Sequence, residues 1–293
     1  MAVFDRQYQP WEGVRTTRAE RLLILPRYAY RGLFASRLFT GLFSAAFLPP
    51  ILGAVYVWLR SNLPMLARIG LTPDKLPVPD GRFFLVGLYV QLCFAAVITL
   101  VQGPALVSPD LVNGSLPLYL SRPVSRTQYV LGKFLVLGLL LSAATWVPLT
   151  LLFLLQGALE TEPWMAANAR ILFGTVAASL LAISVLSLFS LALSAWVKSK
   201  AFARAVMAGM IFIPTGLGLE LNRMLHTDWG HALNLLAVFE TIGAELLGVP
   251  SRNGGPTGTP DLPLAGALLS IAVVTSGSLL LLNRRLRAFE VVR

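Results

Sequence analysis

Six runs of apolar residues, each 19 to 27 residues long, follow one another along the chain and are separated by short polar segments. They lie at 38–59, 83–107, 134–158, 171–197, 203–221 and 264–282. About 20 apolar residues in an α-helix cross about 30 Å of hydrocarbon, so each run predicts a transmembrane helix. The runs occupy nearly half of the chain and leave no room for a soluble catalytic domain. We therefore expect an all-α membrane protein whose six spans form one domain over residues 38–293.

Residues 18–37 precede the first span and mix arginines with leucines and tyrosines. Pro26 suits the first turn of a helix that ends at Arg37. We interpret this pattern as an amphipathic helix lying on the inner membrane surface, within a cytoplasmic or interfacial N-terminal segment of residues 1–37. The alternative is a cytoplasmic extension of the first span. The arginines near the start, with no apolar stretch between them, are not typical of a cleaved signal peptide.

A second amphipathic segment, residues 232–247, precedes the last span. Its apolar stripe at helical spacing consists of Leu233, Leu236, Phe239, Ile242 and Leu246. Asn234, Thr241 and Glu245 face away from the stripe, and Glu240 adds a second acid. Because the segment is short and carries two acids, it predicts an interfacial or outward-facing helix and not a seventh span.

Composition agrees with a membrane protein and excludes two other classes. The chain is 56% hydrophobic and 13% charged, with a mean hydropathy of +0.70. Soluble domains contain about 25% charged residues and disordered chains contain more, so neither class fits. The net charge is +10, and alternate flanks of the spans hold 17 against 7 Lys and Arg residues. The richer set includes both termini, which predicts that both are cytoplasmic. Such a charge favours anionic lipid as a partner over nucleic acid.

The sequence lacks the groups that several membrane activities need. The middles of the six spans contain no Asp, Glu, Lys, Arg or His, which argues against coupling to an ion gradient, although backbone carbonyls can bind sodium. His226 and His231 lie in the outer loop, where ordinary loop polarity is favoured over a surface metal site. The single cysteine, Cys93, excludes a cysteine metal cluster. No phosphate-binding loop occurs either. From these absences together we expect no catalytic residue, metal or cofactor on this chain.

Neutral polar residues and prolines also occur within the spans. Ser187, Ser190 and Ser194 share one face of the fourth span, and we favour helix packing over a substrate path as their role. Prolines that we expect to kink the first, third and fifth spans are Pro49, Pro50, Pro148 and Pro214.

The segment of residues 108–133, between the second and third spans, has the most distinctive pattern. Ser108-Pro109-Asp110 is typical of a helix start, and Asn113-Gly114 of a helix end about one and a half turns later. Leucines and a tyrosine follow, and then Arg122-Pro123 requires extended backbone. A capping box at residues 125–128 restarts a helix that continues through Tyr129 into the third span. We expect a short helix with an apolar and basic surface, anchored at both ends; a hairpin lying on lipid is the alternative.

This segment resembles the cytoplasmic segment between the second and third spans of ABC-2 type permeases. The residues that carry the resemblance are Asp110, Gly114-Ser115-Leu116, Leu120-Ser121-Arg122-Pro123-Val124-Ser125-Arg126, Tyr129 and Gly132-Lys133. The six-span layout and both amphipathic helices are also similar to that family. Two positions depart from the family pattern: Asn113 stands where an acid usually precedes the glycine, and Pro117 follows Leu116 where Glu is frequent.

The resemblance implies a function and a set of coupling residues. ABC-2 permeases are membrane subunits of ATP-binding-cassette exporters, here in a bacterial inner membrane. Two copies of a separate ATPase subunit that binds ATP and Mg²⁺ would dock on this segment, and a second permease, identical or paralogous, would complete the assembly. The coupling residues implied are Asp110, Gly114, Leu118, Arg122, Arg126 and Tyr129. A membrane scaffold or assembly factor that recruits a cytoplasmic partner without transport is the alternative function.

Overall fold

The computed structural model describes residues 29–68, 70, 72, 76–112, 126–160, 163–197, 199–249 and 262–287. Within these residues the secondary structure is helical, and no strand occurs. Six stretches are long and apolar enough to cross a membrane: 37–61, 81–104, 127–159, 169–196, 200–225 and 264–285. They coincide with the six predicted runs, so the fold class is confirmed.

The first span consists of two helices, α2 (Arg37–Ala45) and α3 (Leu48–Ser61), and a short helix α4 (Leu63–Arg68) follows at its end. Residues 29–34 are helical as well, and a break at Ala35 and Ser36 separates them from α2. The Ser36 Oγ accepts a hydrogen bond of 3.4 Å from the Phe39 N–H and so caps α2. Residues 29–34 therefore form a helical piece separate from the first span, and the remainder of the predicted amphipathic helix, residues 18–28, lies outside the described residues.

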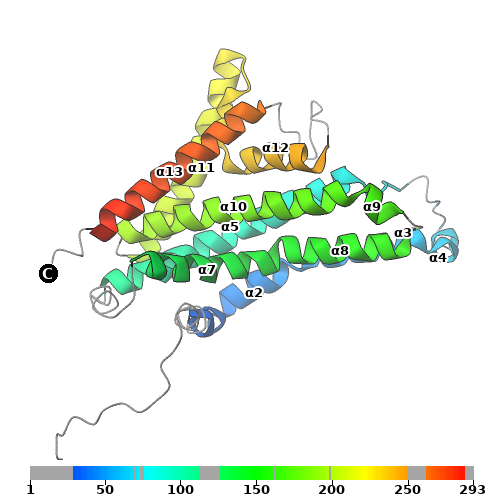
Figure 1. The fold of residues 1–293 in the computed structure, drawn as a ribbon, viewed down its shortest axis with the longest axis horizontal. Helices are drawn as coiled ribbons and strands as arrows, with labels where there is room; N and C mark the ends of the chain where they lie inside the picture. The colour runs from blue at the N-terminus through cyan, green and yellow to red at the C-terminus, as the bar shows by residue number, and fades with distance from the viewer. Residues whose placement is uncertain are drawn as a thin grey trace, which may run out of the picture.

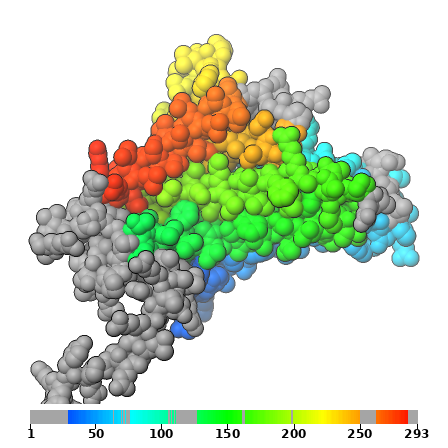
Figure 2. Space-filling view, viewed as in Figure 1, coloured from blue at the N-terminus to red at the C-terminus, as the bar shows by residue number. Residues whose placement is uncertain are grey.

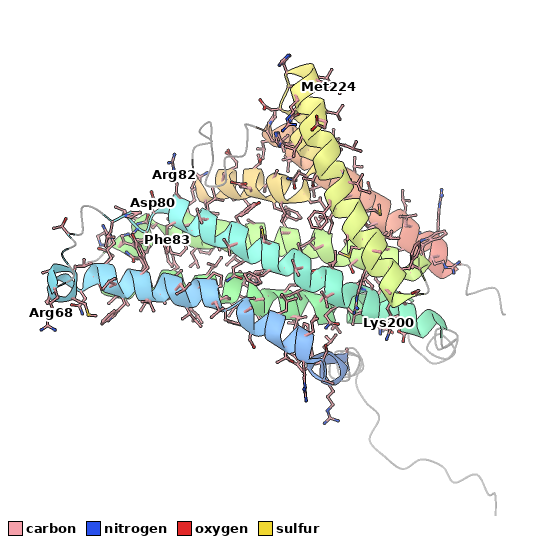
Figure 3. The ribbon with its side chains drawn as sticks, turned by 180° about the vertical axis from the view of Figure 1, so that it is seen from behind. Arg68, Asp80, Arg82, Phe83, Lys200 and Met224 are labelled. Atoms are coloured by element: carbon pink, nitrogen blue, oxygen red, sulfur yellow. The ribbon has the colours of Figure 1, made fainter. Side chains whose placement is uncertain are left out.

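The second span is α5 (Gly81–Val112), and the third is again divided, into α7 (Arg126–Ala144) and α8 (Trp146–Leu159). Asp80 caps α5, because its Oδ1 accepts bonds from the N–H groups of Arg82 and Phe83 at 2.9 and 3.1 Å. Figure 3 shows these three residues at one end of the bundle. The short helix α9 (Trp164–Ala167) leads into the fourth span, α10 (Ala169–Trp196).

Helices α10 and α5 form the centre of the bundle and make its most extensive helix–helix contact. Of an apolar stretch of 18 residues within α10, 67% is buried inside the protein, whereas the corresponding share is 17% in the first, fifth and sixth spans. The fifth span is α11 (Lys200–Leu225), and the sixth is α13 (Leu264–Arg287). Both cross the bundle obliquely, and the end of α11 near Met224 projects well beyond its neighbours (Figures 1 and 3).

A helical hairpin fills the space between these tilted spans and the centre of the bundle. After α11, the 3₁₀ helix η2 (Trp229–Leu233) turns the chain back into α12 (Leu235–Leu247). The hairpin is close-packed where Gly218 of α11 meets Gly230, since a Cβ on either glycine would collide with the backbone of the other. Asn234 Oδ1 caps α12 by accepting bonds from the N–H groups of Leu236 and Ala237 at 3.0 and 3.4 Å.

The outer amphipathic helix is therefore present where its stripe predicts it, but it is more deeply placed than expected. Helix α12 packs against α5, α10 and α13 (Figure 1), and only its Glu245 side remains exposed. Glu240 is just 4% exposed. The space-filling view in Figure 2 shows α12 recessed between α13 and α10. The stripe predicted a helix with one buried face, whereas three surrounding spans cover most of its circumference.

Of the predicted kinks, those in the first and third spans are confirmed as helix breaks. Pro49 and Pro50 follow the break between α2 and α3, and Pro148 follows the break at Thr145 between α7 and α8. Pro214 does not interrupt α11, which is a single helix over residues 200–225. Neighbouring helices can stabilise the backbone around such a proline within a membrane bundle.

Candidate functional site

Three side chains join the two described ends of the 108–133 segment. The Tyr129 hydroxyl donates a hydrogen bond of 2.7 Å to Asp110 Oδ2, and Lys133 Nζ lies 2.9 Å from the same oxygen. The Lys133 ammonium also lies 5.6 Å from the centre of the Tyr129 ring, within the range of a cation–π interaction. We call Asp110, Tyr129 and Lys133 the α5–α7 clamp.

Helix geometry explains why these residues meet. Asp110 lies in the last turn of α5, and Tyr129 and Lys133 are four residues apart near the start of α7, so both face α5. The side chains of Asp110 and Lys133 are only 15% and 12% exposed, and Tyr129 is buried. Charge-assisted bonds in such a sheltered place are stronger than those at a surface. The clamp therefore fixes α5 and α7 to each other beside the segment that connects them.

The prediction that a short helix starts at Ser108 is wrong. Ser108 and Asp110 lie inside α5, which continues without a break to Val112. The Ser108 hydroxyl does not cap a helix; it donates to the carbonyl oxygens of Val197 and Ser194, at 2.8 and 3.3 Å. Packing of α5 along α10 thus extends the helix through a sequence pattern that usually marks a helix start. The restart is confirmed, because α7 begins at Arg126.

The predicted coupling residues are only partly within the described structure. Asp110 and Tyr129 are brought into direct contact. Gly114, Leu118 and Arg122 lie outside the described residues, and of Arg126 the backbone alone is described. Lys133, which completes the clamp, was not among the predicted site residues. Its four-residue spacing from Tyr129 is the signal that could have identified it.

Arginine and tryptophan side chains fasten the other helices at the same end of the bundle. Arg204 of α11 donates from Nε to the Val101 carbonyl of α5 at 2.9 Å. Arg285 of α13 donates from Nε to the Ala195 carbonyl of α10 at 3.2 Å and lies 5.4 Å from the ring of Trp196. The Trp196 Nε1 donates in turn to the Leu281 carbonyl at 3.1 Å. Four spans are thus connected near the α5–α7 clamp.

A family model described as ABC-2 family transporter protein matches residues 38–278. The match covers four spans completely, all but the first residue of another, most of the sixth, and the whole 108–133 segment. The chain belongs to the ABC-2 transporter family. No curated protein matches the sequence. Family membership confirms the resemblance carried by the 108–133 motif, and the chain is accordingly a multi-pass membrane protein and a transport subunit.

The small polar residues for which helix packing was favoured lie inside this ABC-2 subunit. Ser187, Ser190 and Ser194 are fully buried. Gly103 of α5 faces Ser190 so closely that a Cβ on the glycine would overlap the serine side chain. Absence of a side chain at Gly103 therefore permits a close approach of the two central helices.

The two histidines of the outer loop lie at the turn between α11 and α12. No group of three His, Cys, Asp or Glu residues able to hold a metal ion occurs among the described residues. His231 is 8% exposed within η2, and burial lowers its pKa while Asp228 opposes that shift. His226 ends α11 in the left-handed conformation, with φ of 48°. Both residues belong to the turn that returns the chain from α11 to α12.

Proposed function

We propose that this ABC-2 protein is the membrane-spanning subunit of an exporter whose energy comes from a separate ATPase subunit. The ATPase, with its bound ATP and Mg²⁺, docks on the 108–133 segment, and two such permeases pair with two ATPases. Both termini lie in the cytoplasm, and the membrane is the bacterial inner membrane. The uncharged interiors of the six spans favour apolar or amphipathic cargo over small ions.

The α5–α7 clamp is the observation that carries this proposal. A docked partner needs a rigid lever in order to transmit force, and a flexible hairpin would absorb the movement instead. Asp110, Tyr129 and Lys133 bind the two ends of the segment together with contacts of 2.7 and 2.9 Å. A push on the segment would therefore displace α5 and α7 as a pair. Since α5 is one of the two central helices, that displacement reaches the core of the bundle.

Co-purification and ATP hydrolysis test the proposal. Purification from native membranes should recover an ABC ATPase with this chain, and Gly114→Ala and Arg122→Ala should lower stimulated ATP hydrolysis several-fold. Arg223→Ala is the control, because Arg223 lies at the far end of α11 with 75% of its side chain exposed. Normal hydrolysis and transport in folded Gly114 and Arg122 variants would show that the segment does not couple. Recovery of a partner whose binding ignores nucleotides would favour the scaffold function.

A further inference from the structure

The break in the first span leaves a backbone carbonyl that another helix satisfies. In an α-helix the N–H of Pro50 would bond the carbonyl of Ala46, four residues earlier, but proline has no N–H. The Gln91 side chain of α5 supplies the missing donor: its Nε2 donates to the Ala46 oxygen at 3.0 Å, and both residues are fully buried. The position of the break is thus held by a side chain from the second span.

The third span breaks in a related way. Pro148 lacks the N–H that would bond the Ala144 carbonyl, and Thr145 leaves the helical conformation with φ of −110° and ψ of −91°. The Thr145 hydroxyl donates to the Leu141 carbonyl at 2.8 Å and closes the end of α7. Both spans are therefore divided into an inner and an outer helix by prolines.

The two breaks lie at the same level in the bundle. Pro50 and Pro148 line one open groove of about 270 Å³ between α3 and α8, together with Phe47 at the break and apolar side chains of the two helices. Each break removes an i→i−4 backbone hydrogen bond, so the two spans bend most easily at this shared level. Figure 3 shows that α2 and α3 meet at an angle at this level.

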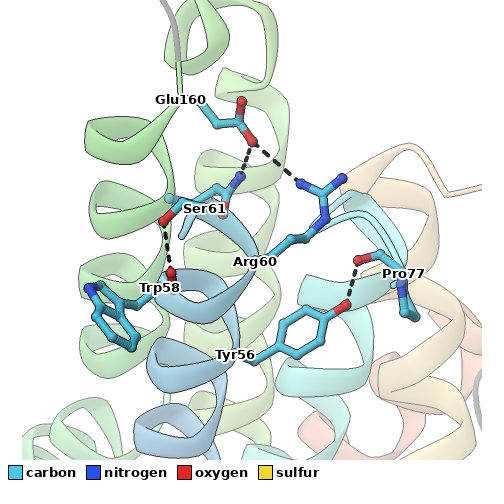
Figure 4. Close-up of polar contacts among 7 residues, drawn as sticks. Tyr56, Trp58, Arg60, Ser61, Pro77 and Glu160 are labelled. Carbon is cyan, nitrogen blue, oxygen red and sulfur yellow. Dashed lines mark hydrogen bonds and ion pairs between the residues drawn. The ribbon is translucent and has the colours of Figure 1, made fainter. Parts of the chain in front are cut away.

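The outer helices α3 and α8 are joined to each other beyond the breaks. Helix α3 packs chiefly against α8, while α2 packs against α5. At their far ends Arg60 Nη1 lies 3.7 Å from Glu160 Oε1, and Gln156 Nε2 donates to that same oxygen at 2.9 Å (Figure 4). Gly53 of α3 accommodates the Leu152 side chain, which would lie 3.0 Å from a Cβ there.

We propose that Pro50 and Pro148 form a common hinge layer about which α3 and α8 move as one unit, and that Gln91 is the positioning residue that sets its angle. This inference rests on the proposed function, because the hinge serves to convert displacement of α5 into movement of the outer half of the membrane domain. Gln91 connects the two, since it belongs to α5 and bonds the backbone at the break.

Spin-label distances on the chain in lipid nanodiscs test the hinge without any ATPase. Cysteines replace exposed Leu38, Val55 and Leu151 in pairs, in a Cys93→Ala background. We expect Gln91→Met to at least double the width of the 38–55 distance distribution, across the break, while the 55–151 distribution, within the α3–α8 unit, stays unchanged. Gln102→Met is the control, because Gln102 is also buried on α5 but lies about 16 Å further along the helix.

A rescue variant separates the hinge from general destabilisation. Pro50→Ala restores the N–H that bonds the Ala46 carbonyl, so Pro50→Ala/Gln91→Met should return to the width of Pro50→Ala alone. Pro50→Ala by itself should narrow the 38–55 distribution, which keeps the test decisive if Gln91→Met does not fold. An unchanged 38–55 width in Gln91→Met, or no rescue, would overturn the role of Gln91. Broadening of the 55–151 distances would overturn the single unit. Neither result depends on ATPase docking, so failure here is distinct from failure of the proposed function.

Discussion

Breaking the ion pair of the α5–α7 clamp should weaken the subunit measurably. At 2.9 Å and an effective dielectric constant of about 20, the attraction between Lys133 and Asp110 is about 6 kcal/mol. Loss of hydration on burial offsets much of this, because the two side chains are only 12% and 15% exposed. We expect a net coupling energy of about 1–3 kcal/mol, between that of exposed and fully buried pairs.

A double-mutant cycle of Asp110→Asn and Lys133→Met measures this coupling. The free energy of unfolding of the purified chain is determined for both single variants and the double variant, which should cost less than the sum of the singles. The pair Glu220 and Arg223 is a matched control, because its distance is also 2.9 Å but its side chains are 57% and 75% exposed. Exposed pairs at this helical spacing contribute about 0.2–0.5 kcal/mol.

The same variants connect the clamp to transport. In complex with the ATPase, both single substitutions should lower stimulated ATP hydrolysis more than the Glu220 and Arg223 control substitutions do. A coupling energy of the clamp no larger than that of the exposed control pair would refute the electrostatic argument. Normal stimulated hydrolysis in a chain whose clamp is measurably broken would refute its role as a lever.

Three further predictions concern other parts of the bundle. Gly103→Ala should lower the free energy of unfolding by about 1–3 kcal/mol because the new Cβ overlaps Ser190, whereas Gly138→Ala should not, since Gly138 has open space around it. Thermal unfolding in detergent compares the two variants. An unchanged stability of Gly103→Ala would contradict the close packing of α5 and α10. Arg170→Met should loosen α12 by about 1 kcal/mol, because Arg170 donates to its last carbonyls at 2.7 and 3.2 Å; faster amide exchange in α12 is the measurement. Burial lowers the pKa of His231 in the folded protein, so folding favours the neutral imidazole. The free energy of unfolding should therefore be at its full value above about pH 6.5, the ordinary pKa of histidine, and should fall as the pH is lowered through the pKa of the folded state. Unfolding of His231→Gln at a series of pH values should lack this decrease.

The span positions were predictable because they depend on a local property. Any helix that crosses hydrocarbon needs about 20 consecutive apolar residues, and this requirement can be read without knowing any neighbour. The break between α2 and α3 was predictable for the same reason, since proline removes a backbone donor wherever it stands. Pro214 shows the limit of that reasoning, because α11 is a single helix over residues 200–225 although it contains this proline.

The candidate site was predictable only in part. Asp110 and Tyr129 were identified from the motif, but their contact was not, because 19 residues of sequence separate them. The Ser-Pro-Asp pattern indicated a helix start, yet contacts with α10 made these residues the end of α5. A local signal of about 1 kcal/mol from a cap is readily overcome by packing against a long neighbouring helix.

Sequence alone determined that the chain crosses a membrane six times, where the first and third spans break, and which segment resembles an ABC-2 coupling element. Only the tertiary structure decided that Lys133 completes the clamp, that α12 is enclosed by three spans, and that Gln91 satisfies the carbonyl freed by Pro50. The first group follows from hydrophobic length and backbone chemistry, which act within one segment. The second depends on which side chains meet across helices distant in sequence, and packing of the whole bundle settles that.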